Sequence, residues 1–414
     1  MTERRRAAMQ FVVLMGVVSL FADMCYEGMR SGVGQFLGLL GASGALVGFI
    51  GGLGEAIGYG LRYVTGRVAD RTHAYWGLTI AGYALTGLAV PALALAPAAW
   101  AVALLVAFER LGKAVRNPAR STLLSFAGEE IGAGWTFGLH QAMDQTGAVL
   151  GPVAVTAVVW WRGGDVDAFR WAFAALAIPA VITMALVLAS RVRYPDPRTL
   201  RPEGARDDAS EAMGPLYRRY LLGAALMAAG LADWALIAFH LGGTGAVPLR
   251  WLAIVYAAAM GVDAIAALVV GRLYDRAQAR GGSGVMVLAV VALIAAAYAP
   301  LVFATSSTAV YLGVALWAGA AAATDSIGKS VVAQLAPAAS RGRAYGGYYA
   351  VYGVAWWAGS VVTGALYDRS PTAAAAFAAA SLIAAAAVLA STAGRLGSRA
   401  RARVDGVPRV DGVS

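Results

Sequence analysis

Ionisable side chains recur at helical spacing inside the long apolar stretches of this sequence. Asp23, Glu27 and Arg30 follow one another at intervals of four and three residues, which places them on one face of a helix. The same spacing returns in three later apolar stretches, at Glu55, Tyr59 and Arg62, at Glu109, Lys113 and Arg116, and at His140 and Asp144. Carboxyl and imidazole groups in apolar surroundings can exchange protons near neutral pH, and nearby cations can rebind a carboxylate that has lost its proton. These stretches therefore predict proton exchange coupled to ion pairing.

The acidic residues of the first half of the chain are the candidates for carrying the proton. They are Asp23, Glu27, Glu55, Glu109 and Asp144. Asp23 is our first choice, because it lies near the middle of its apolar stretch and its carboxyl would be far from bulk water. The five acids are matched by five bases, Arg30, Arg62, Arg110, Lys113 and Arg116. Such a balance is what a buried network of ion pairs requires, since an unpaired buried charge costs several kcal/mol.

Simpler roles are also consistent with these residues. The charge pairs could serve only to hold the helices together. Arg116 and Arg120 lie closest to the end of their apolar stretch, so their side chains could extend to the membrane surface. His140 could titrate, or it could be a packing residue that forms a hydrogen bond with Asp144, one turn away.

The second half of the sequence has fewer ionisable residues in its apolar stretches. Asp233 and Asp263 stand alone, whereas Asp325 is followed by Lys329 four residues later. We expect the three acids to contact substrate or to form ion pairs. A pair between Asp325 and Lys329 is the simpler alternative for these two residues.

An aromatic series follows one helical face near the end of the chain. It consists of Tyr345, Tyr348, Tyr349, Tyr352 and Trp356. Such stripes usually pack against other helices or anchor a helix at the membrane surface. This one runs deep into its apolar stretch, so we interpret Tyr349, Tyr352 and Trp356 as a candidate wall for an organic substrate.

Several classes of chemistry find no support in the sequence. It contains no Walker A pattern for ATP, and three histidines and one cysteine do not form a recognisable metal cluster. Asp23 and Glu27 could bind a hard cation, but Arg30 would compete for the same carboxylates. We expect neither an enzyme nor a cofactor.

The composition shows which elements must position these residues. Hydrophobic residues make up 59% of the 414 residues and charged residues 14%, whereas a soluble domain has roughly 25% charged residues. The apolar runs reach the length of about 20 helical residues that crosses a bilayer. Because lipid leaves no partner for free backbone groups, long apolar runs must be helical. The chain is therefore predicted to be an all-α membrane protein.

Twelve membrane-spanning helices are expected, in two groups of six. The expected spans are 9–38, 44–66, 74–96, 99–121, 134–160, 168–191, 216–241, 249–272, 284–304, 308–335, 343–366 and 372–393. We assign residues 1–191 and 216–394 to the two halves, 192–215 to a polar linker and 395–414 to a tail. The basic N-terminus precedes a first helix that continues past Asp23 and Glu27 without a cleavage pattern, so we expect this helix to be retained.

Arginines are concentrated in alternate loops. They occupy the N-terminus, the linker, the tail and the loops after every second helix, while the other loops have few. The positive-inside rule places both termini and the linker in the cytoplasm, in a multi-pass protein of the cell membrane. The net charge of +10 then reflects this topology and attraction to anionic lipid. Nucleic-acid binding is disfavoured, because the arginines are spread over many loops.

An internal repeat explains the pattern of six and six helices. GRVADR at 66–71 returns as GRLYDR at 271–276, 205 residues later, after the second helix of each half. With twelve helices and a charged central linker, the chain resembles the major facilitator superfamily (MFS) over nearly its whole length. The resemblance implies two pseudo-symmetric six-helix halves and alternating access to a site between them. Its loop signature implies a conformational switch at Gly66, Asp70, Arg71, Gly271, Asp275 and Arg276.

A second resemblance suggests the direction of transport. Gly147, Gly151 and Pro152 match the G-x-x-x-G-P core of a motif typical of proton-coupled exporters of that family, with plain helix packing as the alternative. We expect a monomeric secondary transporter that exports a small organic molecule by using protons. Uptake, transport of a metal or metal complex, and a membrane assembly or signalling role without transport are the alternatives.

Overall fold

Long α-helices joined by short turns make up the chain. The computed structural model describes residues 2–41, 58, 61–202, 214–232, 234–244, 247, 252–304, 306–367 and 369–405, and no β-strand occurs among them. Glu55, Tyr59 and Asp233 lie outside the described residues. The expected all-α architecture is confirmed for the described residues.

The first half of the chain is a bundle of helices, of which α4 extends beyond the span expected at 99–121, and most of the span expected at 44–66 lies outside the described residues. Its elements are α1 (Glu3–Leu39), a helix over residues 61–72, α3 (Tyr75–Ala92) with the 3-10 turn η1 (Leu93–Leu95), α4 (Ala99–Ile131), α5 (Ala133–Arg162), α6 (Val166–Ala175) and α7 (Ala177–Arg193). The α6–α7 pair forms the expected sixth span. The linker begins with the 3-10 turn η2 (Pro197–Leu200).

The second half repeats this arrangement. Its elements are α8 (Pro215–Gly230), α9 (Trp234–Thr244), α10 (Leu252–Ala279), α11 (Val285–Ala295), α12 (Tyr298–Val302), α13 (Ser307–Leu335), η4 (Ala338–Ser340), α14 (Arg341–Tyr367) and α15 (Pro371–Asp405). Together α11 and α12 cover the span expected at 284–304.

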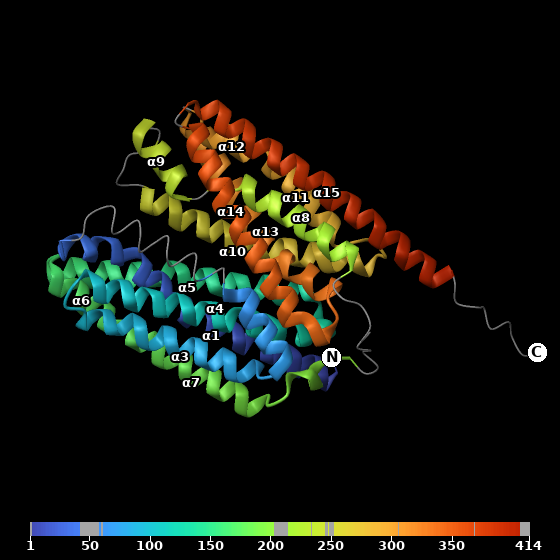
Figure 1. Cartoon of the computed structure of the whole chain (residues 1–414), viewed down its shortest axis with the longest axis horizontal. Helices are drawn as coiled ribbons and strands as arrows, with labels where there is room; N and C mark the ends of the chain where they lie inside the picture. The colour runs from blue at the N-terminus through green and yellow to red at the C-terminus, as the bar shows by residue number, and fades with distance from the viewer. Residues whose placement is uncertain are drawn as a thin grey trace, which may run out of the picture.

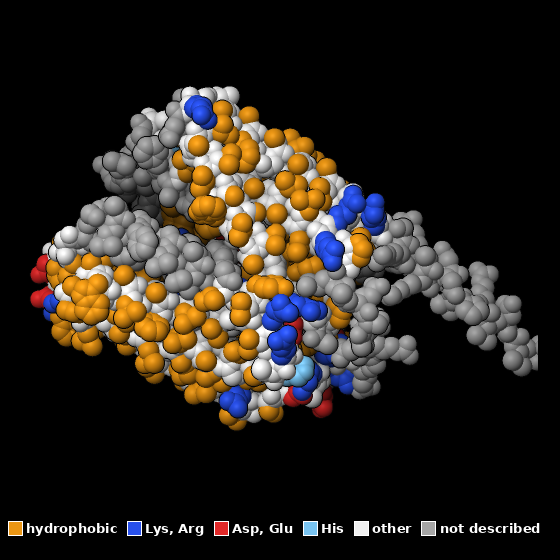
Figure 2. All heavy atoms as spheres, in the orientation of Figure 1, with side chains coloured by type: hydrophobic (Ala, Val, Ile, Leu, Met, Phe, Trp, Pro, Cys, Tyr) orange, Lys and Arg blue, Asp and Glu red, His pale blue; other side chains and the backbone are white. Residues whose placement is uncertain are grey.

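The outer surface of the helices suits lipid. Large apolar side chains such as Leu88, Trp160 and Ile178 are exposed, and hydrophobic groups cover the flanks of the molecule in Figure 2. Eight stretches of the described residues are long and apolar enough to cross a bilayer. α4 is not among them, because charged residues at positions 109, 110, 113 and 116 interrupt its apolar sequence.

The two halves lie side by side and converge at one end (Figure 1). That end holds the N-terminus and the end of α15, and Lys and Arg side chains gather there in Figure 2. We call it the arginine-rich end. Both described termini therefore lie at the same end of the bundle. At the other end the ribbons of the two halves diverge.

Candidate functional site

Asp23, the first-choice proton carrier, is paired with a cation inside the first half. One carboxylate oxygen of Asp23 on α1 lies 3.8 Å from Nη2 of Arg116 on α4. Arg116 is fully buried, donates a 3.0 Å hydrogen bond to Thr86, and stacks on Tyr83 at 4.7 Å from the ring centroid. The alternative in which Arg116 extends to the membrane surface is wrong, because Asp23 pairs with it in the interior.

The neighbouring charges of α4 surround one tyrosine of α1. Arg110 donates a hydrogen bond to the hydroxyl of Tyr26, and Nζ of Lys113 lies 3.5 Å from the centre of its ring. Glu109, 1% exposed, is 3.6 Å from Arg110. Glu27 pairs at 3.6 Å with Arg30 of the same helix. The expected ion-pair network therefore forms around α1 and α4.

A second polar group lies between α1, α4 and α5. Ser19 donates a hydrogen bond to Asp144, and Arg120 donates to Ser19 at 2.8 Å and to Tyr83 at 3.3 Å. Arg120 is 4% exposed, so surface extension is wrong here too. The expected bond between His140 and Asp144 is also absent, because neither ring nitrogen of the buried His140 has a hydrogen-bond partner.

Polar contacts join the two halves near the middle of the bundle. Gln141 of α5 donates to Asp263 of α10 at 3.5 Å. The hydroxyls of Ser121 on α4 and Tyr349 on α14 are 2.9 Å apart, and the guanidinium of Arg62 lies 4.8 Å from the Tyr349 ring centroid. Residues expected from the sequence to contact substrate therefore meet at the contact between the halves.

The aromatic stripe of α14 divides into two parts. Tyr345 and Tyr348 donate hydrogen bonds to carbonyl groups of α13, at Lys329 and Thr324, and Tyr348 stacks on Tyr220. Tyr348 therefore packs inside the second half, whereas the ring of Tyr345 also lies 6.1 Å from the ring of Phe137 on α5 of the first half. Tyr349 contacts the first half as described above, and Tyr352 and Trp356 are partly buried farther along α14.

Asp325 and Lys329 do not form the simple pair that their spacing allowed. The described residues include no ion pair between these two side chains. Lys329 is 5% exposed and acts electrostatically on His140 and Asp144 of α5, across the contact between the halves. Lys329 therefore lies within electrostatic range of α5.

Two glycine-lined contacts close the arginine-rich end. In the first, Gly134 and Gly138 of α5 pack on Gly271 and Ala267 of α10, and a side chain at Gly134 or Gly271 would overlap the other's carbonyl oxygen. In the second, Gly342 and Gly346 of α14 pack in the same way on residues 66 and 62. We call these contacts the first and second glycine seams.

The repeated aspartates cap the seams. Asp275 accepts hydrogen bonds from the backbone N–H groups of Gly134 and Trp135 at 2.9 and 2.6 Å. Asp70 accepts in the same way from Gly342 and Arg343 at 2.7 and 2.6 Å. Each carboxylate thus binds the free amides at the start of a helix in the opposite half, where the helix dipole favours negative charge.

The capping aspartates and the arginines that follow them in the repeated motif differ in exposure. Burial raises the pKa of the Asp70 carboxyl, and the two backbone donors oppose this effect. Arg71 and Arg276 are exposed. Of the expected switch residues, the glycines and aspartates therefore form the contact between the halves.

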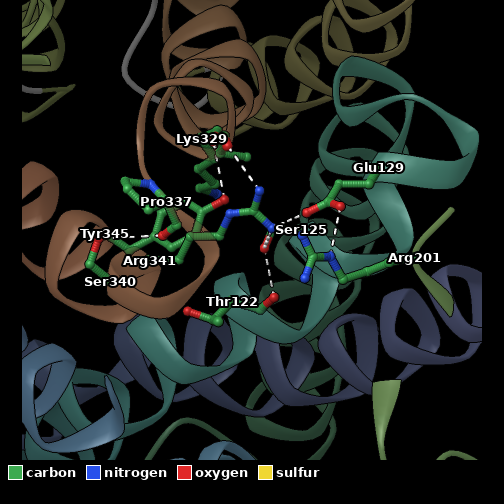
Figure 3. Close-up of polar contacts among 10 residues, drawn as sticks. Thr122, Ser125, Glu129, Arg201, Lys329, Pro337, Ser340, Arg341 and Tyr345 are labelled. Carbon is green, nitrogen blue, oxygen red and sulfur yellow. Dashed lines mark hydrogen bonds and ion pairs between the residues drawn. The ribbon is translucent and has the colours of Figure 1, made fainter. Parts of the chain in front are cut away.

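A cluster of two arginines and one glutamate adds a third link (Figure 3). Glu129, at the end of α4, accepts a hydrogen bond from Arg341, the first residue of α14, and one of 2.8 Å from Arg201 in the linker. Arg341 also reaches Ser125 at 3.3 Å and the carbonyl of Ala333 at 3.2 Å. One carboxylate therefore holds the linker and the second half against the first half.

The exporter-like motif of α5 packs inside the first half. Gly147 and Gly151 lie against the backbone of α1 at Leu20, Met24 and Gly28. α5 continues as one helix through Pro152. The close packing expected from these glycines is present, and a directional role for the motif stays a prediction.

Sequence reasoning missed Gly134, Gly138, Gly342 and Gly346. Their spacing contained a signal, because both pairs read G-x-x-x-G and stand 208 residues apart. Glu129 and Arg341 were also missed. They lie beside the expected ends of their spans, where charged residues are common and do not by themselves indicate a contact.

Comparison with known proteins gives relatives over most of the chain. The sequence model of the Major Facilitator Superfamily matches residues 7–323. Uncharacterized proteins of Mycobacterium bovis and Mycobacterium tuberculosis are each 38% identical over 372 residues, which is 88% of this chain and 88% of theirs. An uncharacterized MFS-type transporter of Methanocaldococcus jannaschii is 27% identical over 150 residues, 36% of this chain and 37% of the relative.

Solved structures share the fold at low sequence identity. A bacterial homologue of the iron transporter ferroportin, in its outward-facing state, gives a TM-score of 0.70 at 15% identity and covers 93% of this chain and 100% of its own. FucP, in the outward conformation, gives 0.67 at 15% identity and covers 92% and 98%. The human organic anion transporter MFSD10 gives 0.66 at 14% identity and covers 96% and 100%.

Proposed function

Because the chain belongs to the Major Facilitator Superfamily and has the fold of its secondary transporters, we propose that it exports a small organic molecule in exchange for protons by alternating access. The observation that carries this proposal is the position of four ionisable groups, of which three are buried and Asp144 is partly buried. Asp144, His140, Asp263 and Lys329 lie on helices that meet between the halves, immediately inward of the glycine seams. A site at this depth would be reached from either side as the halves rock.

The arginine-rich end is assigned to the cytoplasm in this proposal. The positive-inside rule supports the assignment, and so does the gathering of basic side chains in Figure 2. The seams, the aspartate caps and the Glu129 cluster then all close the cytoplasmic side. The conformation described here is accordingly interpreted as outward-facing, the state that is also reported for the similar FucP and ferroportin-homologue structures.

Asp23 is proposed as a carboxyl that exchanges the transported proton. Its pairing with Arg116 supports this role, since protonation of Asp23 would release the arginine and deprotonation would restore the ion pair. Glu109 and Asp144 are further candidates on neighbouring helices. Glu27 pairs locally with Arg30, which supports a structural role for that carboxyl.

An organic substrate is favoured over a metal ion. Tyr349, Tyr352 and Trp356 offer aromatic surface on α14, and Arg62, Arg120 and Lys329 offer positive charge. In the described ranges no three His, Cys, Asp or Glu side chains converge as metal ligands would. The motif at Gly147, Gly151 and Pro152 supports export over uptake.

The proposal can be tested before the substrate is known. Everted membrane vesicles that contain the protein would be energised by respiration, and a pH-sensitive acridine dye would report the proton gradient. Organic cations, organic anions, sugars and divalent metal salts would be added one at a time. A compound exchanged for protons should partly restore the dye fluorescence, and it should not do so in vesicles that lack the protein.

Asp23→Asn should abolish the response to that compound while the protein remains in the membrane at the same level. Movement of substrate and proton in the same direction would instead indicate uptake. A response to metal salts alone would indicate metal transport. If no compound elicits proton movement in the wild type, proton-coupled export is wrong.

A further inference from the structure

Asp263 of α10 lies at the inner end of the first glycine seam. Gly271, Ala267 and Asp263 are spaced four residues apart, so they form one stripe along α10. The first two contact Gly134 and Gly138 of α5. Asp263 continues this series, since Gln141 of α5 donates to it at 3.5 Å. Separation of α5 from α10 would therefore expose this carboxyl last.

The partners of Asp263 across the seam are neutral. Its side chain is buried, with 1% of the residue exposed. Gln141 of α5 donates a hydrogen bond to it, and Gln145 follows one turn later on the same helix. Within the described part of the chain, no Lys, Arg or His forms an ion pair with it. In this respect Asp263 differs from Asp23, which has Arg116 at 3.8 Å.

Other charged and titratable groups lie on the helices packed against α10. α13 contributes Asp325 and Lys329, which act on the Asp263 carboxyl with opposite sign. α5 contributes His140 and Asp144, which directly precede Gln141 and Gln145 in the sequence. α9 holds His240, whose Nδ1 is 2.8 Å from the Tyr367 hydroxyl, and α11 has no ionisable side chain.

We propose that Asp263 binds a proton while the first glycine seam is closed and releases it to water when the seam opens. A buried carboxyl whose hydrogen-bond donor is a neutral amide is more stable neutral than charged, whereas contact with water stabilises its charged form. Proton binding and seam closure therefore favour each other, and this coupling is reciprocal. Amide partners suit the exchange, because they can form hydrogen bonds with either form of the carboxyl.

This inference rests on the proposed proton-coupled export and specifies where the proton acts on the conformation. The proton would reach Asp263 from the outer side while the arginine-rich end is closed. It would leave toward the cytoplasm after α5 and α10 separate. Loss of the proton to the cytoplasm would stabilise the open seam. Release of the proton and the change to the inward-facing state would therefore occur together.

The test measures opening of the arginine-rich end and needs no substrate. Spin labels would be placed at Val68→Cys in the first half and Arg280→Cys in the second half, since both positions are exposed. The native Cys25 is buried and does not compete for the label. Electron-electron double resonance in lipid nanodiscs would give the distance distribution from acidic to alkaline pH.

In the wild-type background the distribution should move from short to long distances as the pH rises. Asp263→Asn, which mimics the protonated carboxyl, should keep the short distances at every pH. Asp263→Glu should restore a pH-dependent change. The control Asp167→Asn removes an exposed acid outside the seam and should behave like the wild type.

A pH response that persists in Asp263→Asn would overturn the inference, and so would a wild type without one. If Asp263→Asn does not fold, infrared difference spectra would decide the question. The carbonyl band of a protonated carboxylic acid should disappear as the seam opens and should shift in Asp263→Glu. A band that is unchanged in Asp263→Glu belongs to another residue and contradicts the assignment.

The vesicle assay separates this inference from the proposed function. Wild-type vesicles without compound-dependent proton movement would contradict proton-coupled export. Vesicles that show this movement both in the wild type and in Asp263→Asn would contradict only the role of Asp263.

Discussion

Individual carboxylates in this protein have three kinds of partner, and each kind suits a different task. Asp23 faces the guanidinium of Arg116, so its charge is compensated in place. Asp70 and Asp275 accept backbone N–H groups at the start of a helix in the opposite half. Asp263 has amide partners across the seam. The first kind stabilises one half, whereas the other two depend on how the halves meet.

Removal of the Asp70 cap should favour opening of the arginine-rich end. Asp70→Ala deletes the acceptor of two backbone N–H groups at the start of α14. Loss of a helix cap costs about 0.5–2 kcal/mol, so the ratio of open to closed molecules should rise by roughly 2- to 30-fold. The Val68–Arg280 spin-label pair would measure this ratio.

Asp196→Ala is the matched control for this prediction. Asp196 caps the turn η2 within the linker and pairs with Arg198 of the same turn, so its removal should leave the distances unchanged. Binding of a compound identified in the vesicle screen should stay within a few-fold in Asp70→Ala. If binding collapses while the distances stay the same, Asp70 belongs to the substrate site and not to the switch.

At the scale of helices, the two glycine seams have the same construction. The G-x-x-x-G pairs at 134–138 and 342–346 let α5 and α14 approach a helix of the opposite half with backbone in contact with backbone. Asp275 and Asp70 then cap α5 and α14 at the same point of each seam. The contact can separate with little loss of side-chain packing, because glycine has no side chain to interlock.

A side chain placed in a seam should hold it open. A valine at Gly134 would overlap the carbonyl oxygen of Gly271, and overpacking of a tight contact costs about 1–3 kcal/mol. Gly134→Val should therefore shift the spin-label distances toward the long population at every pH. Since closure and proton binding favour each other, the transition should also occur at lower pH.

Gly261→Ala is the matched control on α10. A methyl group at Gly261 meets no atom within 4 Å, so the distances should stay as in the wild type. If Gly134→Val also keeps the short distances, the first glycine seam does not determine closure of this end.

At the scale of the whole molecule, the described contacts between the halves extend from the arginine-rich end to the middle of the bundle. The Glu129 cluster, the aspartate caps and the seams follow one another along this path, which ends at Asp263 and Tyr349. Rocking of the halves would break these contacts in sequence. Arg201 ties the linker to Glu129 of the first half, so the linker should stay with that half while Arg341 moves away.

The membrane topology is the prediction made at the scale of the whole molecule. Reporter fusions after residue 204 and at the C-terminus should both be cytoplasmic, because the described residues that precede each position lie at the arginine-rich end. Green fluorescent protein should fluoresce at both positions, and alkaline phosphatase should be inactive there. A phosphatase inserted at the turn of Gly163 and Gly164, at the opposite end, should be active. Phosphatase activity after residue 204 would reverse the assigned orientation and with it the proposed facing state.

Much of the architecture could be predicted because it depends on local physics. Lipid requires each spanning segment to satisfy its own backbone hydrogen bonds, so the apolar runs specified helices and their approximate ends. The repeated GRxxDR marked equivalent places in the two halves, which are the last turns of the helix over residues 61–72 and of α10. Helical spacing placed Asp23, Glu27 and Arg30 on a single helix. The helices needed only neighbours within a few residues along the chain, and the repeat needed only a comparison of the two halves of the sequence.

Partners across helices were decided by the tertiary structure alone. The spacing of His140 and Asp144 allowed a hydrogen bond between them that does not form. Because α5 packs against α1, Asp144 instead accepts a hydrogen bond from Ser19. Position near a helix end suggested that Arg116 reaches the surface, yet the bundle surrounds it with Asp23, Thr86 and Tyr83. Which side chains meet depends on the angle and distance at which whole helices cross, and those are set by all contacts of the bundle together.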